Sequence, residues 1–206
     1  MSRAFLSTYR PLCGARAGRE ASARHGLLPF IDGSCQREPD LEAKFPTISA
    51  LCRVKRFAPR LQKCDRVAYM TKLGRYDERE AHWRLTALLT VLERFESHAG
   101  AAEWHRARGL ALPRNCMVDR NPPLPLDFTD LTQKDLRVWE GSYRRRAAIC
   151  NAMLVCRADF RELREPPRIT RADWKAWNGG VPGTQTPPSL KDDLWQHLED
   201  RAHGRA

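Results

Sequence analysis

The sequence lacks the long apolar runs that a membrane-spanning or secreted chain requires. No stretch approaches the roughly 18 consecutive apolar residues of a transmembrane helix. Near the N-terminus, only the short patch Ala4-Phe5-Leu6 follows Arg3, which is too brief for the apolar region of a signal peptide. We therefore expect a cytoplasmic protein with no membrane partner.

The cysteines lack the pairing that a disulfide scaffold or a zinc site requires. Their number, seven, is odd, and no two of them form a Cys-x-x-Cys pair. Secreted disulfide-rich domains and zinc ribbons are thereby disfavoured, and we expect most of the thiols to be reduced and buried. The residues are Cys13, Cys35, Cys52, Cys64, Cys116, Cys150 and Cys156.

The signatures of the commonest enzymes are also missing. There is no Walker phosphate loop, no dinucleotide fingerprint, no His-Glu-x-x-His and no Gly-x-Ser-x-Gly turn. His98 and His105 lie seven residues apart on a predicted helix, too far for a chelating pair at i and i+4. We therefore predict no metal and no cofactor, although the absence of a motif does not exclude an enzyme.

Acidic residues are too few to balance the basic ones. The chain has 36 Lys and Arg residues against 25 Asp and Glu residues, which leaves a formal net charge of +11. A basic excess of this size favours contact with phosphate groups. The excess is nearly all arginine, so a bias in genomic base composition is the alternative explanation.

The chain is long enough for one domain with a sizeable core. Its 206 residues are 42% hydrophobic, which suits a single globular domain or a domain with an elaborated tail. We place a core domain at residues 1–165 and a C-terminal helical extension at 166–206, because the composition changes after Pro166-Pro167. Phosphate contact and a single basic domain together point to a nucleic-acid partner.

The stretch from Cys64 to Gly109 organises the rest of the chain. The side chains of residues 66–71 alternate between the two faces of a predicted strand, and both faces can be covered. Residues 72–82 are predicted to form a charged, exposed connection that contains Gly74. Residues 84–95 are ambiguous. Leu85, Leu88, Leu89 and Leu92 follow helical spacing, whereas Leu85, Ala87, Leu89 and Val91 alternate along one strand face.

A short helix is expected after this segment. Ser97 is suited to cap a helix over 98–108, and Gly109 is suited to end it. Trp104 lies on this helix.

This order of elements resembles two related families. One is the PUA-like class, which includes the EVE, ASCH and YTH domains, and the other is the nucleotide-modification-associated domains. The resemblance covers about residues 30–125 and favours a strand over 84–95. Cys64 stands where these families have a turn glycine before Asp65. The matching residues are Leu51-Cys52-Arg53, Phe57-Ala58-Pro59-Arg60, 65–71, 84–94 and 95–104.

The N-terminal part contains one further strand and a loop. In residues 3–10, Phe5, Ser7 and Tyr9 share one strand face. Residues 13–25 contain Gly14 and Gly18 and are predicted to be a mobile loop. Residues 47–54 are predicted to be a strand.

The densest acidic cluster contains Glu38, Asp40 and Glu42. Such a cluster can act as acid and base or bind a hard metal, but no histidine is near it in sequence. We favour a solvated loop in which these acids pair with nearby arginines.

A basic segment with an aromatic residue covers 55–63. Four cations there surround Phe57, a composition typical of surfaces that follow a phosphate backbone and stack a base. The equal alternative is that Phe57 and Leu61 anchor the loop while the cations remain in water.

A proline-rich loop over 110–129 is the best place to expect a ligand-contacting segment. Long loops without their own secondary structure are often functional, and Asn115 and Cys116 lie within this one. Cys116 could act as a nucleophile with a histidine, although a buried thiol is the more common situation.

The C-terminal third is predicted to be mainly helical. Residues 132–150 carry an apolar stripe that includes Trp139 and Tyr143, and 152–163 are either a strand or a continuation of the helix. Further helices are expected over 171–177, capped by Thr170, and over 190–201, with Trp174 and Trp195 holding the extension against the core.

The resemblance implies an α+β fold, a PUA-like mixed β-barrel or curved sheet with flanking helices, and a function in recognising DNA, RNA or a modified nucleotide. The alternatives are a nucleotide- or base-modifying enzyme that uses the cluster of Glu38, Asp40 and Glu42 or Cys116, and a phage-defence accessory that binds a protein through its C-terminal helix. The candidate nucleic-acid-binding residues are Arg53, Lys55, Arg56, Phe57, Arg60, Lys63, Trp83, Trp104 and Asn115.

Overall fold

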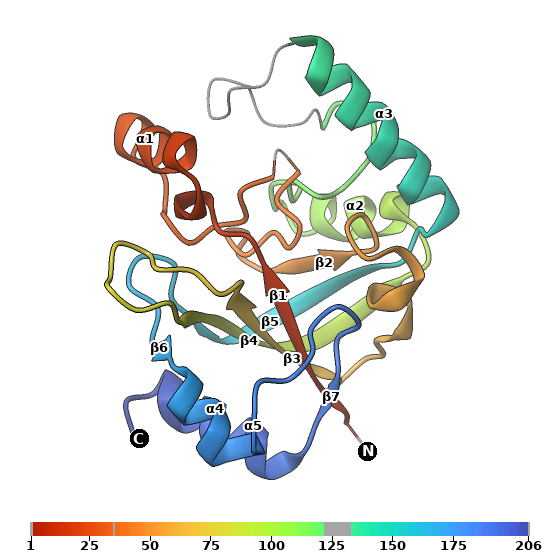
Figure 1. The fold of residues 1–206 in the computed structure, drawn as a ribbon. Coiled ribbons are helices and arrows are strands. Elements are labelled where there is room, and N and C mark those ends of the chain that lie inside the picture. The colour runs from red at the N-terminus through yellow and green to blue at the C-terminus, as the bar shows by residue number, and fades with distance from the viewer. Residues whose placement is uncertain (1, 35, 122–132, 206) are drawn as a thin grey trace.

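The computed structural model describes residues 2–34, 36–121 and 133–205, with the backbone alone described for 133–136 and 139. The chain is a mixed α+β protein built on one sheet (Figure 1). Its strands are β1 (Ala4–Tyr9), β2 (Thr47–Ser49), β3 (Arg66–Thr71), β4 (Trp83–Phe95), β5 (Met153–Arg161), β6 (Arg168–Ile169) and β7 (Ser189–Leu190). Its α-helices are α1 (Arg16–His25), α2 (His98–Arg106), α3 (Gln133–Ile149), α4 (Arg171–Asn178) and α5 (Asp192–Ala202). Three 3-10 turns are η1 (Leu12–Gly14), η2 (Val54–Arg56) and η3 (Ala58–Arg60).

The sheet has seven strands, six of them in the order β2-β5-β4-β3-β1-β7, while β6 pairs with β4. Strands β1 and β3 are parallel, and the other pairs are antiparallel. In the described part of the chain β2 and β7 do not pair, so the sheet is not closed. The α+β class is confirmed, and the sheet is open rather than a closed barrel.

Alternation along β1 and β3 directs side chains to two separate cores. Phe5 and Val67 belong to one hydrophobic cluster, whereas Leu6 and Ala68 belong to the other. Because successive side chains of a strand point to opposite faces, both faces of the sheet must be covered. Helices α1 and α3 lie on one side of the sheet and α4 and α5 on the other (Figure 1).

The segment 84–95 is a strand, as predicted, but one residue was placed on the wrong face. The register shifts between Tyr69 and Met70, which pair with Ala87 and Leu85. The extra residue between those partners is a β-bulge, and it reverses the alternation. Leu85 therefore packs in the opposite cluster from Ala87.

The turn before β3 forms without the family glycine. Cys64 adopts φ of 70°, the left-handed region that favours glycine. Its backbone N–H donates to Val91 O at 2.9 Å, and Asp65 then accepts hydrogen bonds from the backbone of Gln62 and from Arg3. The neighbouring hydrogen bonds thus hold Cys64 in a strained conformation.

The prediction of a mobile loop over 13–25 is wrong, because α1 occupies most of it. Gly18 is not a flexible point: a Cβ there would lie 1.8 Å from Leu12 O, so glycine permits close backbone contact. The helix ends at Gly26, which has φ of 63°. The strand predicted over 47–54 stops at Ser49 and continues as turns into η2.

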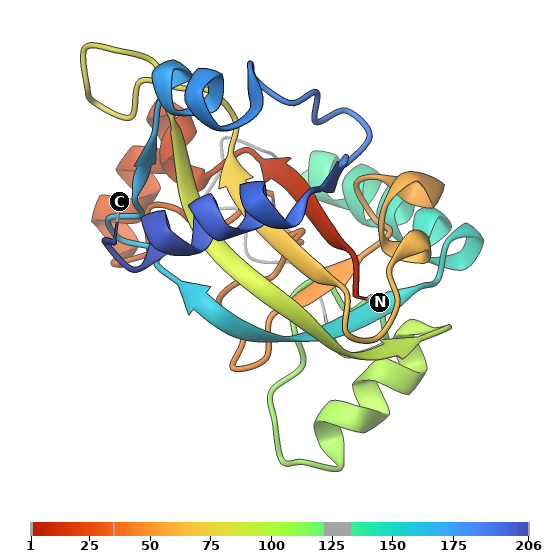
Figure 2. The same ribbon diagram turned by 90° about the horizontal axis from the view of Figure 1, so that it is seen from below.

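The residues after 165 supply most of the cover for one face of the sheet. Trp174 and Trp195 are buried in the cluster that contains Leu6, Met70 and Leu88, and α5 crosses that face in Figure 2. Thr170 and Asp173 form a capping box at the start of α4, as Thr170 was expected to do. The apolar face of α5 is thus occupied by the chain's own sheet.

The remaining predicted elements agree with the structure within a few residues. Ser97 caps α2 by accepting from Gly100 N at 3.0 Å, and Gly109 has φ of 62°. Helix α3 is present, while the side chain of Trp139 and residues 122–132 of the proline-rich loop lie outside the described residues. The segment 152–163 contains strand β5.

Candidate functional site

A cavity of about 850 Å³ opens on the face of the sheet that α1 and α3 flank. We call it the central cavity. Its floor comes from β1 and β3, and its walls come from the segments 32–39, 49–57 and 184–185 and from α3. The lining residues are Ser7, Thr8, Tyr9, Arg10, Asp32, Gly33, Ser34, Glu38, Pro39, Ser49, Cys52, Arg53, Arg56, Phe57, Tyr69, Lys72, Tyr143, Arg146, Thr184 and Gln185.

Three aromatic side chains line the deep part of the central cavity. The ring centroid of Tyr69 lies 6.2 Å from that of Tyr9 and 6.4 Å from that of Phe57, both in edge-to-face arrangements. Tyr9 and Tyr69 share one face of parallel strands, so strand alternation brings them together. Burial raises the pKa of both tyrosine hydroxyls well above the ordinary value, so the rings offer a neutral, rigid wall.

Two buried carboxyl groups also line the central cavity. Asp32 Oδ1 accepts hydrogen bonds at 3.0 Å from the backbone N–H groups of Ser34 and Glu38, and it also accepts from the Ser34 hydroxyl. These bonds form an Asx-type turn that fixes the segment after Ile31. Burial raises the pKa of Asp32 to about 6, although these hydrogen bonds oppose the shift.

Residues of β2 and of the proline-rich loop hold Glu38 in place. Its carboxyl group accepts from Ser49 N at 3.0 Å and from the Ser49 hydroxyl, and Asn115 Nδ2 donates to it at 2.9 Å. Burial raises the pKa of Glu38 to about 8. A carboxyl group positioned in this way can accept from a ligand or exchange a proton near neutral pH.

Asn115 supports Glu38 and is fully buried. It donates to Thr47 O at 3.1 Å and accepts from the Thr47 hydroxyl at 2.7 Å. All of these contacts are within the protein, and Asn115 does not line the central cavity. The proline-rich loop therefore acts on the site through Glu38.

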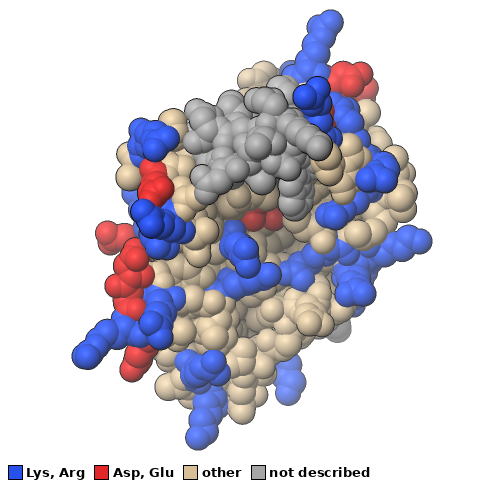
Figure 3. Space-filling model, turned by 45° about the horizontal axis from the view of Figure 1, so that its top comes forward, with Lys and Arg blue, Asp and Glu red and all other residues tan. Residues whose placement is uncertain are grey.

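Five cations border the central cavity, namely Arg10, Arg53, Arg56, Lys72 and Arg146. Within residues 2–34, 36–121 and 133–205, none of the five forms an ion pair with a carboxylate. Figure 3 shows acidic atoms recessed near the middle of this face with Lys and Arg side chains beside them. The cavity therefore combines buried acids with cations whose charge is available to a ligand.

Arg53 lines the central cavity and also connects two segments of the chain. Its guanidinium donates to Thr8 O at 2.6 Å and to Thr184 O at 2.8 Å. These bonds connect β1 to the segment before β7, so Arg53 fixes the shape of the cavity mouth.

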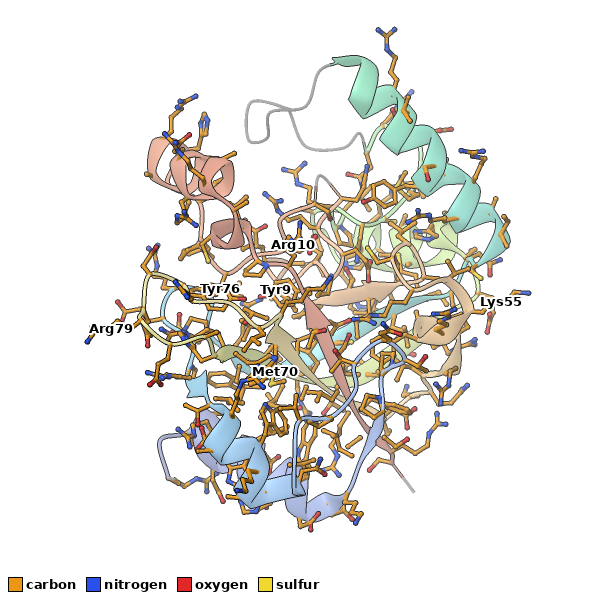
Figure 4. The ribbon with its side chains drawn as sticks, viewed as in Figure 1. Tyr9, Arg10, Lys55, Met70, Tyr76 and Arg79 are labelled. Atoms are coloured by element: carbon orange, nitrogen blue, oxygen red, sulfur yellow. The ribbon has the colours of Figure 1, made fainter. Side chains whose placement is uncertain are left out.

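The predicted basic segment is divided between the central cavity and the outer surface. Arg53, Arg56 and Phe57 line the cavity. The other three residues do not: Lys55 lies at the periphery and points outward (Figure 4), Arg60 is exposed, and Lys63 pairs with Glu93 at 3.1 Å. The turn at η2 and η3 causes this division, because it sends successive side chains in different directions.

The two tryptophans predicted to stack a base lie outside the central cavity. Trp83 is only 7% exposed and packs edge-to-face on Trp174, with ring centroids 6.4 Å apart. Trp104 lies on α2, where Phe45 contacts its edge and the Arg108 guanidinium lies 4.0 Å from its ring centre. Trp83 is thus a core residue beside a different cavity, and Trp104 is half-buried on α2.

The prediction of a solvated acidic loop is wrong for Glu38 and Asp40, which are buried, whereas Glu42 is exposed and pairs with an arginine as predicted. Asp40 is buried and accepts from the backbone N–H groups of Glu42, Ala43 and Arg114. Glu42 pairs with the buried Arg37. Only Glu38 of the three acids lines the central cavity, because the chain turns away after Pro39.

Cys116 has the properties of a structural thiol. It is fully buried, its Sγ donates to His98 O at 3.3 Å, and burial raises its pKa to about 12. A thiol in this state is a poor nucleophile. No group of three or more His, Cys, Asp or Glu side chains in the described parts of the chain is arranged to hold a metal ion.

Several lining residues were missed from sequence. Tyr9 and Tyr69 lie in the predicted strands 3–10 and 66–71, but nothing in the pattern separated a cavity wall from a packed core. Asp32 precedes Gly33 in the sequence, a pair that is typical of a turn. Its position directly after an apolar run was the one available signal for burial.

The comparisons identify no relative: no family model, no curated protein and no solved structure matches this chain. Among the helices of the described residues, none has both the length and the apolar character needed to cross a membrane.

Proposed function

We propose that this protein binds nucleic acid or a modified nucleobase, and that the base occupies the central cavity. The observation that carries the proposal is the combination in one cavity of aromatic walls, buried carboxyl groups and unpaired cations. A volume of about 850 Å³ is within the usual range of small-molecule sites and exceeds what one base needs.

The distribution of charge supports this assignment. A nucleotide has a polar base edge at one end and an anionic phosphate at the other, so it needs hydrogen-bonding groups in the interior and cations at the border. Asp32 and Glu38 are buried carboxyl groups, and the hydroxyl residues Ser7, Thr8 and Ser49 are buried beside the same cavity. Arg10 and Arg56 are exposed cations at the border. A purely apolar ligand would leave both sets without partners.

We further propose that the chain belongs with the PUA-like and nucleotide-modification-associated proteins. The Cys-Arg element of that resemblance, Cys52-Arg53, lies in the cavity wall. The turn before Asp65 leads into the strand that carries Tyr69. Cys52, Arg53, Phe57 and Tyr69 of the matching residues thus border the proposed site, whereas residues 84–104 do not line it. Association with DNA or nucleotide modification follows from this relationship as part of the proposal.

Two exposed cysteines allow the location of the ligand to be tested. Cys52 lines the central cavity, whereas Cys64 lies beside Lys63 on the outer basic surface. Burial of its sulfur raises the pKa of Cys52 well above the ordinary value, so this thiol labels slowly. Maleimide labelling of the wild-type protein is therefore followed over time for each thiol separately by peptide mass spectrometry. We expect a saturating single-stranded oligonucleotide to slow the labelling of Cys52 about fivefold or more and to leave Cys64 unchanged, because only the first thiol is covered.

Protection of Cys64 without protection of Cys52 would instead place the nucleic acid on the outer surface formed by Lys55, Arg60 and Lys63. Labelling of both thiols at unchanged rates, with oligonucleotide in excess, would contradict the proposal. The buried cysteines Cys13, Cys150 and Cys156 serve as internal references for unfolding.

A base- or nucleotide-modifying enzyme is the second candidate function, and Glu38 is the residue that favours it. A buried carboxyl group with a pKa of about 8 in a ligand-sized cavity is suited to general acid–base catalysis. In that case Glu38→Gln would reduce turnover about 100-fold or more while ligand affinity stays within about tenfold. A binding protein would show no turnover in either form.

A further inference from the structure

We infer that the central cavity selects a base that carries an exocyclic amino group, which the carboxyl oxygens of Asp32 and Glu38 accept. This inference rests on the proposed function and specifies the class of base. It follows from which oxygen atoms of the two acids are already used by the protein.

Asp32 uses one carboxyl oxygen and leaves the other open. Oδ1 accepts from Ser34 N, from the Ser34 hydroxyl and from Glu38 N. Across the described residues no donor reaches Oδ2, although the Asp32 residue as a whole is only 6% exposed and lines the cavity. Asp32 Oδ2 is also not among the polar atoms sealed from solvent, so it faces the cavity space.

Glu38 shows the same division between its two oxygens. Oε2 accepts from the Ser49 hydroxyl and from Asn115 Nδ2 at 2.9 Å. Oε1 accepts only from Ser49 N, and it shares that hydrogen bond with Oε2. Ser49 N lies 3.0 Å from Oε1 and 3.1 Å from Oε2. A carboxylate oxygen has two lone pairs, so Oε1 retains the capacity to accept from a ligand.

The nearby donors do not offset these acceptors. The terminal nitrogens of Arg53 donate to the carbonyls of Thr8, Thr184 and Gln185, and Arg146 donates to Leu51 O at 2.9 Å. Neither arginine therefore fills the open acceptor positions of Asp32 and Glu38. An amino group of a base supplies the missing donors, whereas an oxo group at the same position would place two acceptors against each other.

The test uses single-stranded DNA oligonucleotides that differ at one central base by one group. Cytosine and uracil differ by an amino against an oxo group, adenine and hypoxanthine differ in the same way, and guanine differs from hypoxanthine by an amino group in place of hydrogen at C2. Affinity is measured by fluorescence anisotropy at about pH 8.5, above the pKa values of about 6 and about 8 of the two acids.

We expect at least one amino-bearing base to bind about tenfold or more tightly than its partner. Equal affinity within about twofold in all three pairs, with binding still weakened by salt, would overturn the inference and leave nucleic-acid binding intact. Absence of binding by every oligonucleotide would overturn both.

A conservative variant separates recognition from folding. Asp32→Asn can keep Oδ1 as the acceptor for its three donors and replace the open Oδ2 with an NH₂ group. We expect this change to remove the amino preference or reverse it toward the oxo base. Asp77→Asn, which makes the same charge change at an exposed residue outside the cavity, should keep the wild-type preference.

An unchanged preference in a folded Asp32→Asn protein would exclude Asp32 from recognition and contradict the inference as stated. If the variant does not fold, which its melting curve shows, the three base pairs measured on the wild-type protein decide the question alone.

Discussion

Asn115 Nδ2 donates a hydrogen bond of 2.9 Å to Glu38 Oε2, across 77 positions of sequence. This bond joins the proline-rich loop to the wall of the central cavity. Neither residue is near the surface of the protein, since both are buried. The position of the carboxyl group in the cavity therefore depends on a loop that contributes none of its own described residues to the lining.

Removing this amide should destabilise the protein. Asn115→Ala leaves Glu38, the Thr47 hydroxyl and Thr47 O each without one buried partner, and each such loss costs about 1–3 kcal/mol. We expect the free energy of unfolding to fall by about 2–4 kcal/mol in denaturant titrations. Asn178→Ala, at an exposed amide that bonds only Gly180 O, is the control and should change it by less than about 0.5 kcal/mol. Equal losses in both variants would contradict the buried network.

Stability should decrease as pH rises toward 8. The pKa of Glu38 is raised from 4.5 to about 8 and that of Asp32 from 3.8 to about 6. Between these values the folded chain keeps protons that the unfolded chain has lost, so raising the pH favours unfolding. The dependence should not exceed about 1.4 kcal/mol per pH unit for each acid.

The matched measurement is urea unfolding at several pH values for the wild type and Glu38→Gln. The variant should lose the decrease between about pH 6 and pH 8 and, below pH 6, should keep only the part of the decrease that belongs to Asp32. Burial lowers the pKa of His98 to about 4, so His98 opposes the decrease below about pH 6.5 in both proteins alike. The carboxyl groups with lowered pKa values, Asp65, Glu162 and Asp173, act below this range. Identical pH profiles in the two proteins would show that Glu38 does not titrate as the structure indicates.

Trp83 should behave as a core residue. Its ring packs on Trp174 and is 7% exposed, and removing a buried tryptophan costs about 3–5 kcal/mol. We expect Trp83→Ala to lower the melting temperature by about 6–20 °C. Trp104→Ala, which removes a half-buried ring on α2, should lower it less. Normal melting of Trp83→Ala together with lost oligonucleotide affinity would restore Trp83 as a ligand contact.

Cys64→Gly should stabilise the turn before β3. A left-handed conformation costs a non-glycine residue about 1–2 kcal/mol, and Cys64 has φ of 70°. Glycine removes that strain but adds about 0.5–1 kcal/mol of backbone entropy, so the net gain should be up to about 1 kcal/mol. Cys52→Gly, at another exposed cysteine that is not among the residues with positive φ, should destabilise the protein. A loss of stability in Cys64→Gly would contradict the strained turn.

Local patterns were sufficient to predict most elements of the fold. The strand alternation of 66–71, the Ser97 cap and the Thr170 capping box each depend on neighbours in sequence, and each is confirmed. The periodicity of residues 84–95 leaned slightly to a helix, and the strand was chosen from the resemblance. Leu85 was misplaced because a bulge depends on the partner strand, which alternation within one strand does not reveal.

The candidate site was only partly predictable. The basic residues were singled out by their composition, and Arg53, Arg56 and Phe57 do line the central cavity, whereas Asn115 does not. Tyr9 and Tyr69 come from distant segments that meet through the parallel pairing of β1 and β3, and Asp32 lies beside them through its bridge to Pro11. Such convergence is a property of topology, and a single sequence does not encode it in any local pattern.

The most direct test of nucleic-acid binding in the central cavity compares two double variants of equal charge. Arg10→Ala/Arg56→Ala removes two cations that line the cavity, whereas Lys55→Ala/Lys63→Ala removes two that do not. Affinity for a single-stranded oligonucleotide is measured from about 50 to 200 mM salt, and log K against log[salt] should have a slope of about −0.7 for each phosphate contacted.

The proposal predicts that the cavity variant loses about tenfold or more in affinity at about 50 mM salt and has a shallower salt slope, while the outer variant stays within about threefold of the wild type. Equal losses in the two variants, or no binding by the wild-type protein at about 50 mM salt, would contradict it.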